Sequence, residues 1–218
     1  MSVLLVAMSA IVAIYYEWPS GAAFLTWYAT WQHDGGMLLA ALAAGFAGGI
    51  LSELSLVYIR DKGRWTLTHL ENMGFRFVVF FLSGIIVFVF YQYQAVWFGD
   101  GFTWDIIVPK VLVDQFIFSV FWSTTYQTIT FRWQALRYSG SKLWEELNWD
   151  FVIDRMLPVL VTNWMFWIPG VTLVYAMPLI LQMPLNIFAT AIWSLLLASL
   201  AKPHLPSDPE PEPEPMVP

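Results

Sequence analysis

Four polar residues recur at every fourth position of one apolar stretch: Gln115, Ser119, Ser123 and Gln127. At 3.6 residues per turn, this spacing places them on one face of a helix whose other faces carry mainly apolar side chains. Such a polar stripe can line a water-filled path between helices, where the lining groups set selectivity. It can also supply hydrogen bonds between helices packed in a membrane. The sequence leaves both interpretations open.

Three charged residues accompany the polar stripe. Lys110 and Asp114 are four positions apart just before it, which is close enough on a helix for the two to pair. Glu53 follows a row of small residues in an earlier apolar stretch. A charge within a membrane span is costly and commonly marks a functional site. The candidate pore-lining or buried polar residues are therefore Glu53, Lys110, Asp114, Gln115, Ser119, Ser123 and Gln127.

The composition indicates the environment in which these residues lie. Of the 218 residues, 58% are hydrophobic and only 12% are charged, and the mean hydropathy is +0.61. A soluble domain carries about a quarter charged residues, so a soluble globular fold is excluded. The 13 Trp and 9 Tyr suit the level of the lipid headgroups. The absence of Cys excludes disulfides, thiol catalysis and cysteine-bound metals.

Five stretches have the roughly 20 apolar residues that a membrane-spanning helix needs. They cover residues 37–59, 75–98, 106–131, 156–177 and 179–200. A sixth apolar run, residues 3–16, is short and favours an interfacial helix, a re-entrant helix or a short sixth span. We therefore predict an all-α integral membrane protein. Its core is a bundle of about five transmembrane helices. An N-terminal apolar helix and an amphipathic helix on the inner surface accompany this bundle.

The amphipathic helix is predicted between the third and fourth spans. Leu143, Trp144, Leu147 and Phe151 recur there at helical spacing with acidic and amide residues between them. Trp144 and Trp149 would anchor this helix at the membrane surface.

The predicted organisation has three parts. Residues 1–35 form an N-terminal apolar or interfacial segment, and residues 36–202 form the helical bundle. Residues 203–218 alternate Pro with acidic residues, which predicts a disordered, solvated tail.

Basic residues predict the orientation. With five antiparallel spans, nine of the ten Lys and Arg residues fall on one side, and Lys110 alone falls opposite. The positive-inside rule then places the basic loops and the C-terminal tail on the inner side. The nine residues are Arg60, Lys62, Arg64 and Arg76 in the first loop, Arg132, Arg137, Lys142 and Arg155 in the third loop, and Lys202 after the fifth span.

Small residues mark one face of the first span in two rows at intervals of four. Such rows let two helix backbones approach closely in a membrane, so Gly45, Gly48 and Gly49 are predicted to pack against another helix. Glu53 continues the second row and points into the bundle, either as a buried, hydrogen-bonded acid or as a group that faces water. The rows are Ala40, Ala44, Gly48 and Ser52, and Ala41, Gly45 and Gly49.

Three sequence elements resemble a known family. The run GGILSE (residues 48–53) is similar to its glycine-rich first span, and KVLVDQ (residues 110–115) to its K-x-x-x-D-Q signature. The run TNWMFWIP (residues 162–169), followed by Pro178 and Trp193, resembles its last third. Together they resemble the Mpv-seventeen and peroxisomal-membrane-protein-twenty-two family over residues 27–199. The matching positions in the last third are Asn163, Trp164, Trp167, Pro169, Pro178 and Trp193.

The resemblance is to a divergent member. Gly49 stands where the family has Asp, Ile168 separates Trp167 from Pro169, and Gln182 replaces an Arg. What the resemblance implies is a small helical protein of a peroxisomal, mitochondrial or other membrane. It further implies either a weakly selective channel for small solutes or a factor in membrane and organelle homeostasis.

Two functions follow as expectations. The first is a weakly selective channel or pore for small hydrophilic solutes, formed within one bundle or between protomers of a homo-oligomer. The alternative is a structural or interaction protein in which the polar stripe joins helices. Both have the lipid bilayer as partner, in a bacterial inner membrane or an organelle, and neither uses a cofactor or nucleic acid. An enzyme is not expected, because no HExxH, GxSxG, Walker or GxGxxG pattern occurs and His33 and His69 lack a second ligand at metal spacing.

Overall fold

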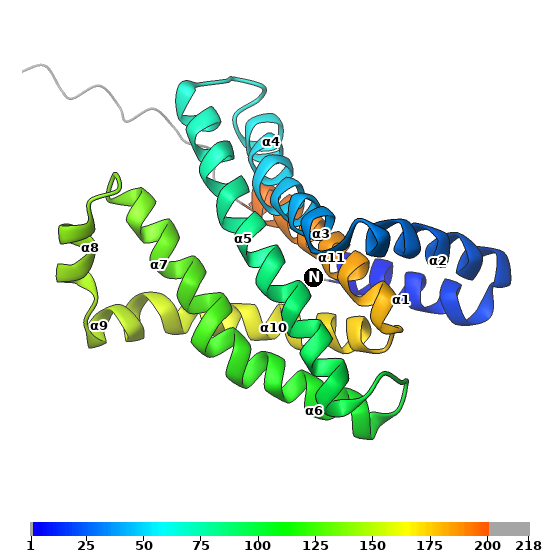
Figure 1. Ribbon diagram of the computed structural model, residues 1–218. Coiled ribbons are helices and arrows are strands. Elements are labelled where there is room, and N and C mark those ends of the chain that lie inside the picture. The colour runs from blue at the N-terminus through cyan, green and yellow to red at the C-terminus, as the bar shows by residue number, and fades with distance from the viewer. Residues whose placement is uncertain (1, 201–218) are drawn as a thin grey trace, which may run out of the picture.

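The computed structural model describes the backbone of residues 2–200 and the side chains of residues 5–59 and 61–193. The predicted acidic tail lies outside these residues. The described chain is helical throughout, as predicted (Figure 1). The helices are α1 (Ser2–Glu17), α2 (Pro19–Asp34), α3 (Gly36–Gly45), η1 (Phe46–Leu51), α4 (Ser52–Ser55), η2 (Leu56–Arg60), α5 (Leu67–Phe98), α6 (Trp104–Val113), η3 (Asp114–Ser123), α7 (Thr124–Ala135), α8 (Gly140–Glu146), α9 (Trp149–Phe151), η4 (Val152–Met156), α10 (Leu157–Tyr175) and α11 (Leu179–Leu200).

Four continuous helices are long and apolar enough to cross a membrane: Gly36–Ile59, Leu67–Phe98, Trp104–Ala135 and Trp149–Tyr175. The chain is therefore a multi-pass membrane protein. Three of these helices contain π-helical segments, labelled η, where the backbone hydrogen bonds run from i to i+5. The fifth predicted span corresponds to α11, whose residues Leu179–Trp193 count among the shorter apolar helices.

Several residues predicted in loops lie inside helices. They are Arg60 in η2, Arg76 in α5, Arg132 in α7, Lys142 in α8 and Arg155 in η4. The second span begins at Leu67 rather than residue 75, so Arg76 belongs to α5 and not to the first loop, and His69 lies in the first turn of α5. The chain turns just before, where Lys62 and Gly63 adopt positive φ angles of 52° and 77°. The charged residues marked the limit of the apolar stretch, but charge by itself does not end a helix.

The predicted inner-surface helix is wrong as a single element. Helix α8 ends at Glu146, and a new helix begins at Trp149 that continues to Tyr175. Asn148 separates them, because its side-chain oxygen accepts a hydrogen bond from the backbone N–H of Phe151 and so caps the new helix. Trp144 and Trp149 are both exposed, while Phe151 is buried.

The N-terminal segment contains two helices where the sequence predicts one. Pro19 stands in the first turn of α2, a position that suits its fixed φ angle. The α1–α2 hairpin projects to the right in Figure 1 and packs on α10, α11 and α3. Thr, Ser and Gly residues interrupt the apolar pattern of α2, which is why no helix is predicted there.

The small residues of α3 and η1 lie against α5, which runs beside them (Figure 1). A Cβ atom placed on Gly49 would lie 2.5 Å from the backbone nitrogen of Phe77, and one on Gly45 would lie 2.9 Å from the Phe77 ring. A Cβ atom on Gly48 would collide with the Phe80 ring. The two helix backbones therefore approach too closely at Gly49 for any larger residue to fit without a shift.

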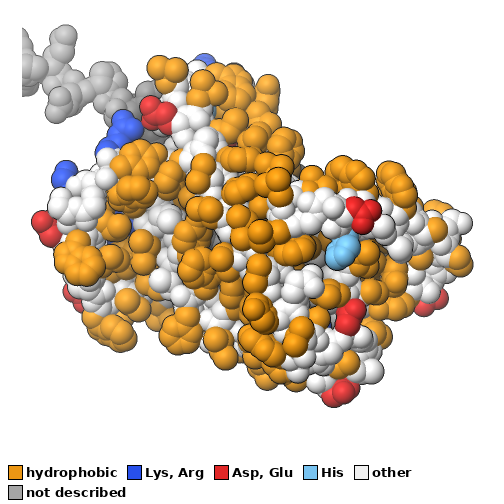
Figure 2. Space-filling model, in the orientation of Figure 1, with side chains coloured by type: hydrophobic (Ala, Val, Ile, Leu, Met, Phe, Trp, Pro, Cys, Tyr) orange, Lys and Arg blue, Asp and Glu red, His pale blue; other side chains and the backbone are white. Residues whose placement is uncertain are grey.

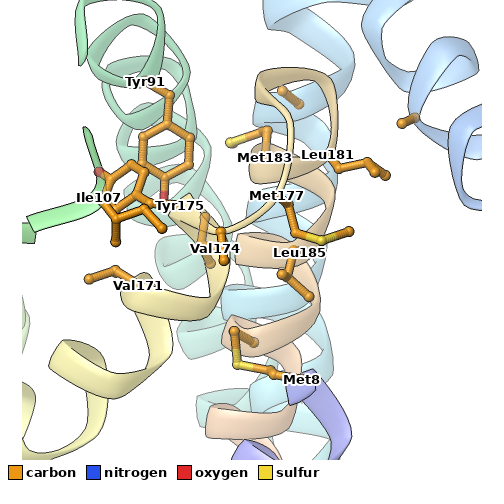
Figure 3. Close-up of a cluster of buried hydrophobic side chains, with 14 of the residues drawn as sticks. Met8, Tyr91, Ile107, Val171, Val174, Tyr175, Met177, Leu181, Met183 and Leu185 are labelled. Atoms are coloured by element: carbon orange, nitrogen blue, oxygen red, sulfur yellow. The ribbon is translucent and has the colours of Figure 1, made fainter. Parts of the chain in front are cut away.

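A buried apolar cluster joins α5, α6, α10 and α11 with α1, α2 and α3. The rings of Tyr91 and Tyr175 pack together beside Ile107, and Met183 projects from α11 nearby (Figure 3). The outer surface is largely apolar, and on the face in Figure 2 the Lys and Arg side chains gather at the upper left, where α5 begins and α7 meets α8.

Candidate functional site

A cavity of about 300 Å³ lies inside the bundle, between α3 with η1 and α4, α5, η3 with α7, α10 and α11. Its wall contains all four residues of the polar stripe together with Asp114. The opposite walls add polar groups from α4, α5, α10 and α11, and aromatic and aliphatic side chains line the rest. The other polar lining residues are Ser52, Arg76, Ser83, Tyr91, Asn163, Asn186 and Thr190, and the aromatic ones are Phe80, Phe118, Phe131, Trp167 and Trp193.

Hydrogen bonds to α10 hold the polar stripe in place. Asn163 Nδ2 donates to Ser119 Oγ at 3.3 Å, and Trp164 Nε1 donates to the backbone carbonyl of Gln115 at 2.7 Å. Gln115 lies in η3, where the i to i+5 bonding rearranges the backbone ladder. The stripe thus combines contacts between helices with a face toward the cavity.

Asp114 is buried, with 6% of its surface exposed, and is held by neutral donors. Tyr175 donates its hydroxyl to one carboxylate oxygen at 2.5 Å, and the Gln115 amide donates to the other at 2.8 Å. Gln94 extends the network by donating to the Tyr175 hydroxyl at 3.3 Å. Where side chains are described, no Lys, Arg or His forms an ion pair with Asp114. Within the described side chains, the acid at this end of the cavity therefore lacks a cationic partner.

The predicted pairing of Lys110 with Asp114 is wrong. Lys110 is fully buried, but its Nζ lies 5.6 Å from the centre of the Tyr175 ring and makes no hydrogen bond to any described residue. The face of an aromatic ring attracts a cation, and Tyr175 and Gln115 already bind the Asp114 oxygens. Lys110 also lies outside the cavity wall, so its position on the same helix face does not make it a lining residue.

Glu53 is a buried, hydrogen-bonded acid with 1% of its surface exposed. His69 Nδ1 lies 2.8 Å from Glu53 Oε1, and Arg76 Nη1 lies 3.3 Å from Oε2. Asn72 Nδ2 also donates to Oε1 at 3.4 Å. His69, Asn72 and Arg76 lie on successive turns of one face of α5, at a spacing that the sequence displays. The extent of α5 is what sequence reasoning missed, and with it these partners.

Arg76 links this ion-pair cluster to the cavity. Its Nη1 donates to Ser52 Oγ at 3.2 Å, and both residues line the cavity, whereas Glu53 does not. The positive charge at this end of the cavity is therefore paired with a buried carboxylate.

A second cavity of about 260 Å³ lies between α2, α5, the turn before α11 and the start of α11. Tyr91 and Met183 line both cavities, so these two side chains form part of the partition between them. Asn186 Nδ2 donates to the Tyr91 hydroxyl at 2.9 Å and fixes the ring there. The other residues of the second cavity are Gln32, His33, Ala40, Phe88, Gln92, Asp100, Pro178, Leu179, Ile180 and Pro184.

The residues of the last-third motif surround the polar stripe. Asn163 and Trp164 bond to it, Trp167 and Trp193 line the first cavity, and Pro178 lines the second. Pro169 lies inside α10. In the described part of the chain, no cluster of three or more His, Asp or Glu side chains could hold a metal ion.

Comparison with known proteins finds no matching protein family, no similar curated protein and no similar solved structure. The fold and the site thus define a class only: a multi-pass helical membrane protein whose bundle holds a cavity lined on one side by a polar stripe.

Proposed function

We propose that the protein is a weakly selective channel for small hydrophilic solutes. The observation that carries this proposal is that all four residues of the polar stripe line one internal cavity. Membrane bundles use polar side chains as hydrogen-bond donors between helices, but such contacts alone do not account for a cavity that all four stripe residues line. A space of this kind suits water and small polar solutes.

The length of the cavity supports a path along the bundle. Arg76 and Tyr91 both line it and are 15 residues apart on α5, which is about 22 Å along a helix. The hydrocarbon layer is about 30 Å thick. The second cavity continues beyond Tyr91 and Met183 to the exposed Asp100. The partition at Tyr91 and Met183 would then be the narrow point of the path.

We further propose that α11 acts as a fifth span and that the basic loops lie on the inner side. The first cavity would then open from the inner end of α5 at Arg76, and the second from the opposite side. Membership of the Mpv-seventeen and peroxisomal-membrane-protein-twenty-two family, and with it a peroxisomal or mitochondrial location, is proposed on the three sequence motifs alone. A bacterial inner membrane is the other proposed location.

Solute release from sealed liposomes tests the channel. Purified protein is reconstituted with a trapped small polyol, and release is compared with that from protein-free liposomes. A Ser123→Phe variant fills the cavity from the stripe, and Ile117→Phe places the same ring on the exposed side of the same helix. We expect release from the wild type and Ile117→Phe, and strongly reduced release from Ser123→Phe. Release no faster than from empty liposomes would overturn the proposal.

A second candidate function is a structural protein in which the polar stripe only joins helices. The observation in its favour is that α10 donates hydrogen bonds to Ser119 and to the Gln115 carbonyl. Ser119→Leu and Trp164→Phe each remove one of these hydrogen bonds and so separate the two functions. A structural role predicts that the wild type releases no solute and that the variants fail to fold or assemble. The channel predicts that the variants fold and release solute at an altered rate.

A further inference from the structure

The second cavity contains a buried amide that no part of the described protein satisfies. Gln32 lines this cavity with 4% of its surface exposed. Neither its Nε2 nor its Oε1 has a hydrogen-bond partner. An unsatisfied buried donor or acceptor destabilises a fold substantially, and such groups in native proteins are nearly always bonded. Gln32 therefore offers an unpaired donor and an unpaired acceptor to any molecule that carries the complementary acceptor and donor.

The geometry of an amide defines the hydrogen-bonding part of that molecule. Nε2 donates and Oε1 accepts in one plane. A primary carboxamide presents the same two groups in reverse order, so it can form two parallel hydrogen bonds with Gln32. A carboxylate has no donor for Oε1, and a dialkylated amide has none either.

The surrounding side chains define the rest of the molecule. The rings of Phe88 and Tyr91 and the apolar side chains of Met183 and Pro184 line the same cavity. Aromatic rings prefer offset or edge-on contact with other rings. Asp100, whose carboxylate accepts from the backbone N–H of Leu179 at 3.0 Å, adds negative charge at the exposed side of the cavity and disfavours anions.

We propose that the second cavity is a binding site for small uncharged aromatic carboxamides, with Gln32 as the recognition residue and Phe88 and Tyr91 as the walls that hold the ring. The cavity volume of about 260 Å³ suits a single-ring compound. The site goes beyond the proposed channel, since binding requires no passage of solute through the bundle.

Binding of benzamide to the protein in lipid nanodiscs tests the site, with empty nanodiscs to subtract partition into lipid. Isothermal titration is run with benzamide, N,N-dimethylbenzamide and benzoate. We expect saturable binding of benzamide, and binding about tenfold weaker or less for each analogue, because losing one or both paired hydrogen bonds removes about 1.4 kcal/mol or more.

The matched variants are Gln32→Met, which keeps the length of the side chain without its polar atoms, and Gln127→Met, which makes the same change in the first cavity alone. We expect Gln32→Met to bind benzamide about tenfold more weakly while its melting temperature stays equal or rises, because two unpaired polar atoms are removed. Gln127→Met should bind as the wild type does.

Three results would overturn the proposal. The first is that the wild type shows no saturable benzamide binding, which would mean that the Gln32 amide bonds to water alone. The others are that Gln32→Met binds benzamide as tightly as the wild type does, or that the wild type binds N,N-dimethylbenzamide as tightly as benzamide. Solute release is not measured here, so a failure of this site and a failure of the channel are separate outcomes.

Discussion

Two buried acids, Glu53 and Asp114, have opposite surroundings. Glu53 has two basic side chains as partners, His69 at 2.8 Å and Arg76 at 3.3 Å. Among the side chains that the structure describes, Asp114 has only the neutral donors Tyr175 and Gln115. Glu53 lies outside the cavity, whereas Asp114 lines it.

The difference separates a structural from a functional charge. A buried ion pair becomes strongly destabilising when one partner is removed, because the other charge stays buried alone. A carboxylate held by neutral donors leaves no orphaned charge when it is replaced by an amide. Glu53 therefore fastens the start of α5 to α4, and Asp114 is available to act on what enters the cavity.

The largest expected effect is on Glu53. Glu53→Gln leaves Arg76 without its buried countercharge, and we expect the free energy of unfolding to fall by about 3 kcal/mol. Denaturant titration in detergent micelles measures this change. A loss below about 1 kcal/mol would show that the Glu53 cluster does not fasten α5, and the contrast with Asp114 would disappear.

The second largest effect is expected where η1 packs against α5, because this contact positions Glu53. Gly49 lies one turn before it, and an added Cβ would press on the Phe77 backbone at 2.5 Å. We expect Gly49→Ala to destabilise the protein by about 2 kcal/mol through overpacking. Gly74→Ala is the control, since a Cβ there meets no atom within 4 Å. Equal stability of the two variants would contradict the close approach of η1 and α5.

A smaller effect on stability and a larger one on solutes are expected for Asp114. In Asp114→Asn the amide can still bond to Tyr175, and Gln94 Oε1 offers a free acceptor for a rearranged network. We expect a loss of about 1 kcal/mol or less. The ratio of cation to anion release from liposomes should fall by about twofold or more, because a lining charge is removed. If the folded variant keeps the wild-type ratio, Asp114 has a structural role as Glu53 does, and the proposed difference between the two acids is wrong.

The smallest effect is expected at a half-buried ion pair between α7 and α8, away from both cavities. Arg132 donates two hydrogen bonds of 2.6 Å to Glu146, which lower the pKa of the Glu146 carboxyl. The pair's contribution is therefore complete above the ordinary pKa of Glu and is lost as the pH falls through the lowered value. Solvent makes this contribution slight. Melting curves at successive pH values should show a slightly weaker acid dependence in Glu146→Gln, and an identical dependence would contradict the pairing.

The sequence predicted the helical membrane fold because apolar length is a local property that needs no knowledge of contacts. It predicted the polar stripe for the same reason, since Ser119 and Ser123 share one helix face. It paired Lys110 with Asp114 wrongly, because Tyr175, which binds Asp114, is 61 residues away along the chain.

The remaining differences also depend on distant contacts. The partners of Glu53 lie on another helix whose start was placed eight residues too late, at residue 75 instead of Leu67. The second cavity forms where α2, α5 and α11 come together. The spacing of residues along the chain does not show which distant helices contact one another.

The central claim is that the polar stripe faces a water-filled space, and cysteine labelling tests it directly. The chain has no Cys, so Ser123→Cys and Ile117→Cys each introduce a single thiol on the same helix, one lining the cavity and one exposed on the apolar surface. The measurement is the rate at which a charged methanethiosulfonate reagent labels each variant in liposomes. We predict rapid labelling of Ser123→Cys and little labelling of Ile117→Cys; equal rates, or faster labelling of Ile117→Cys, would contradict the account.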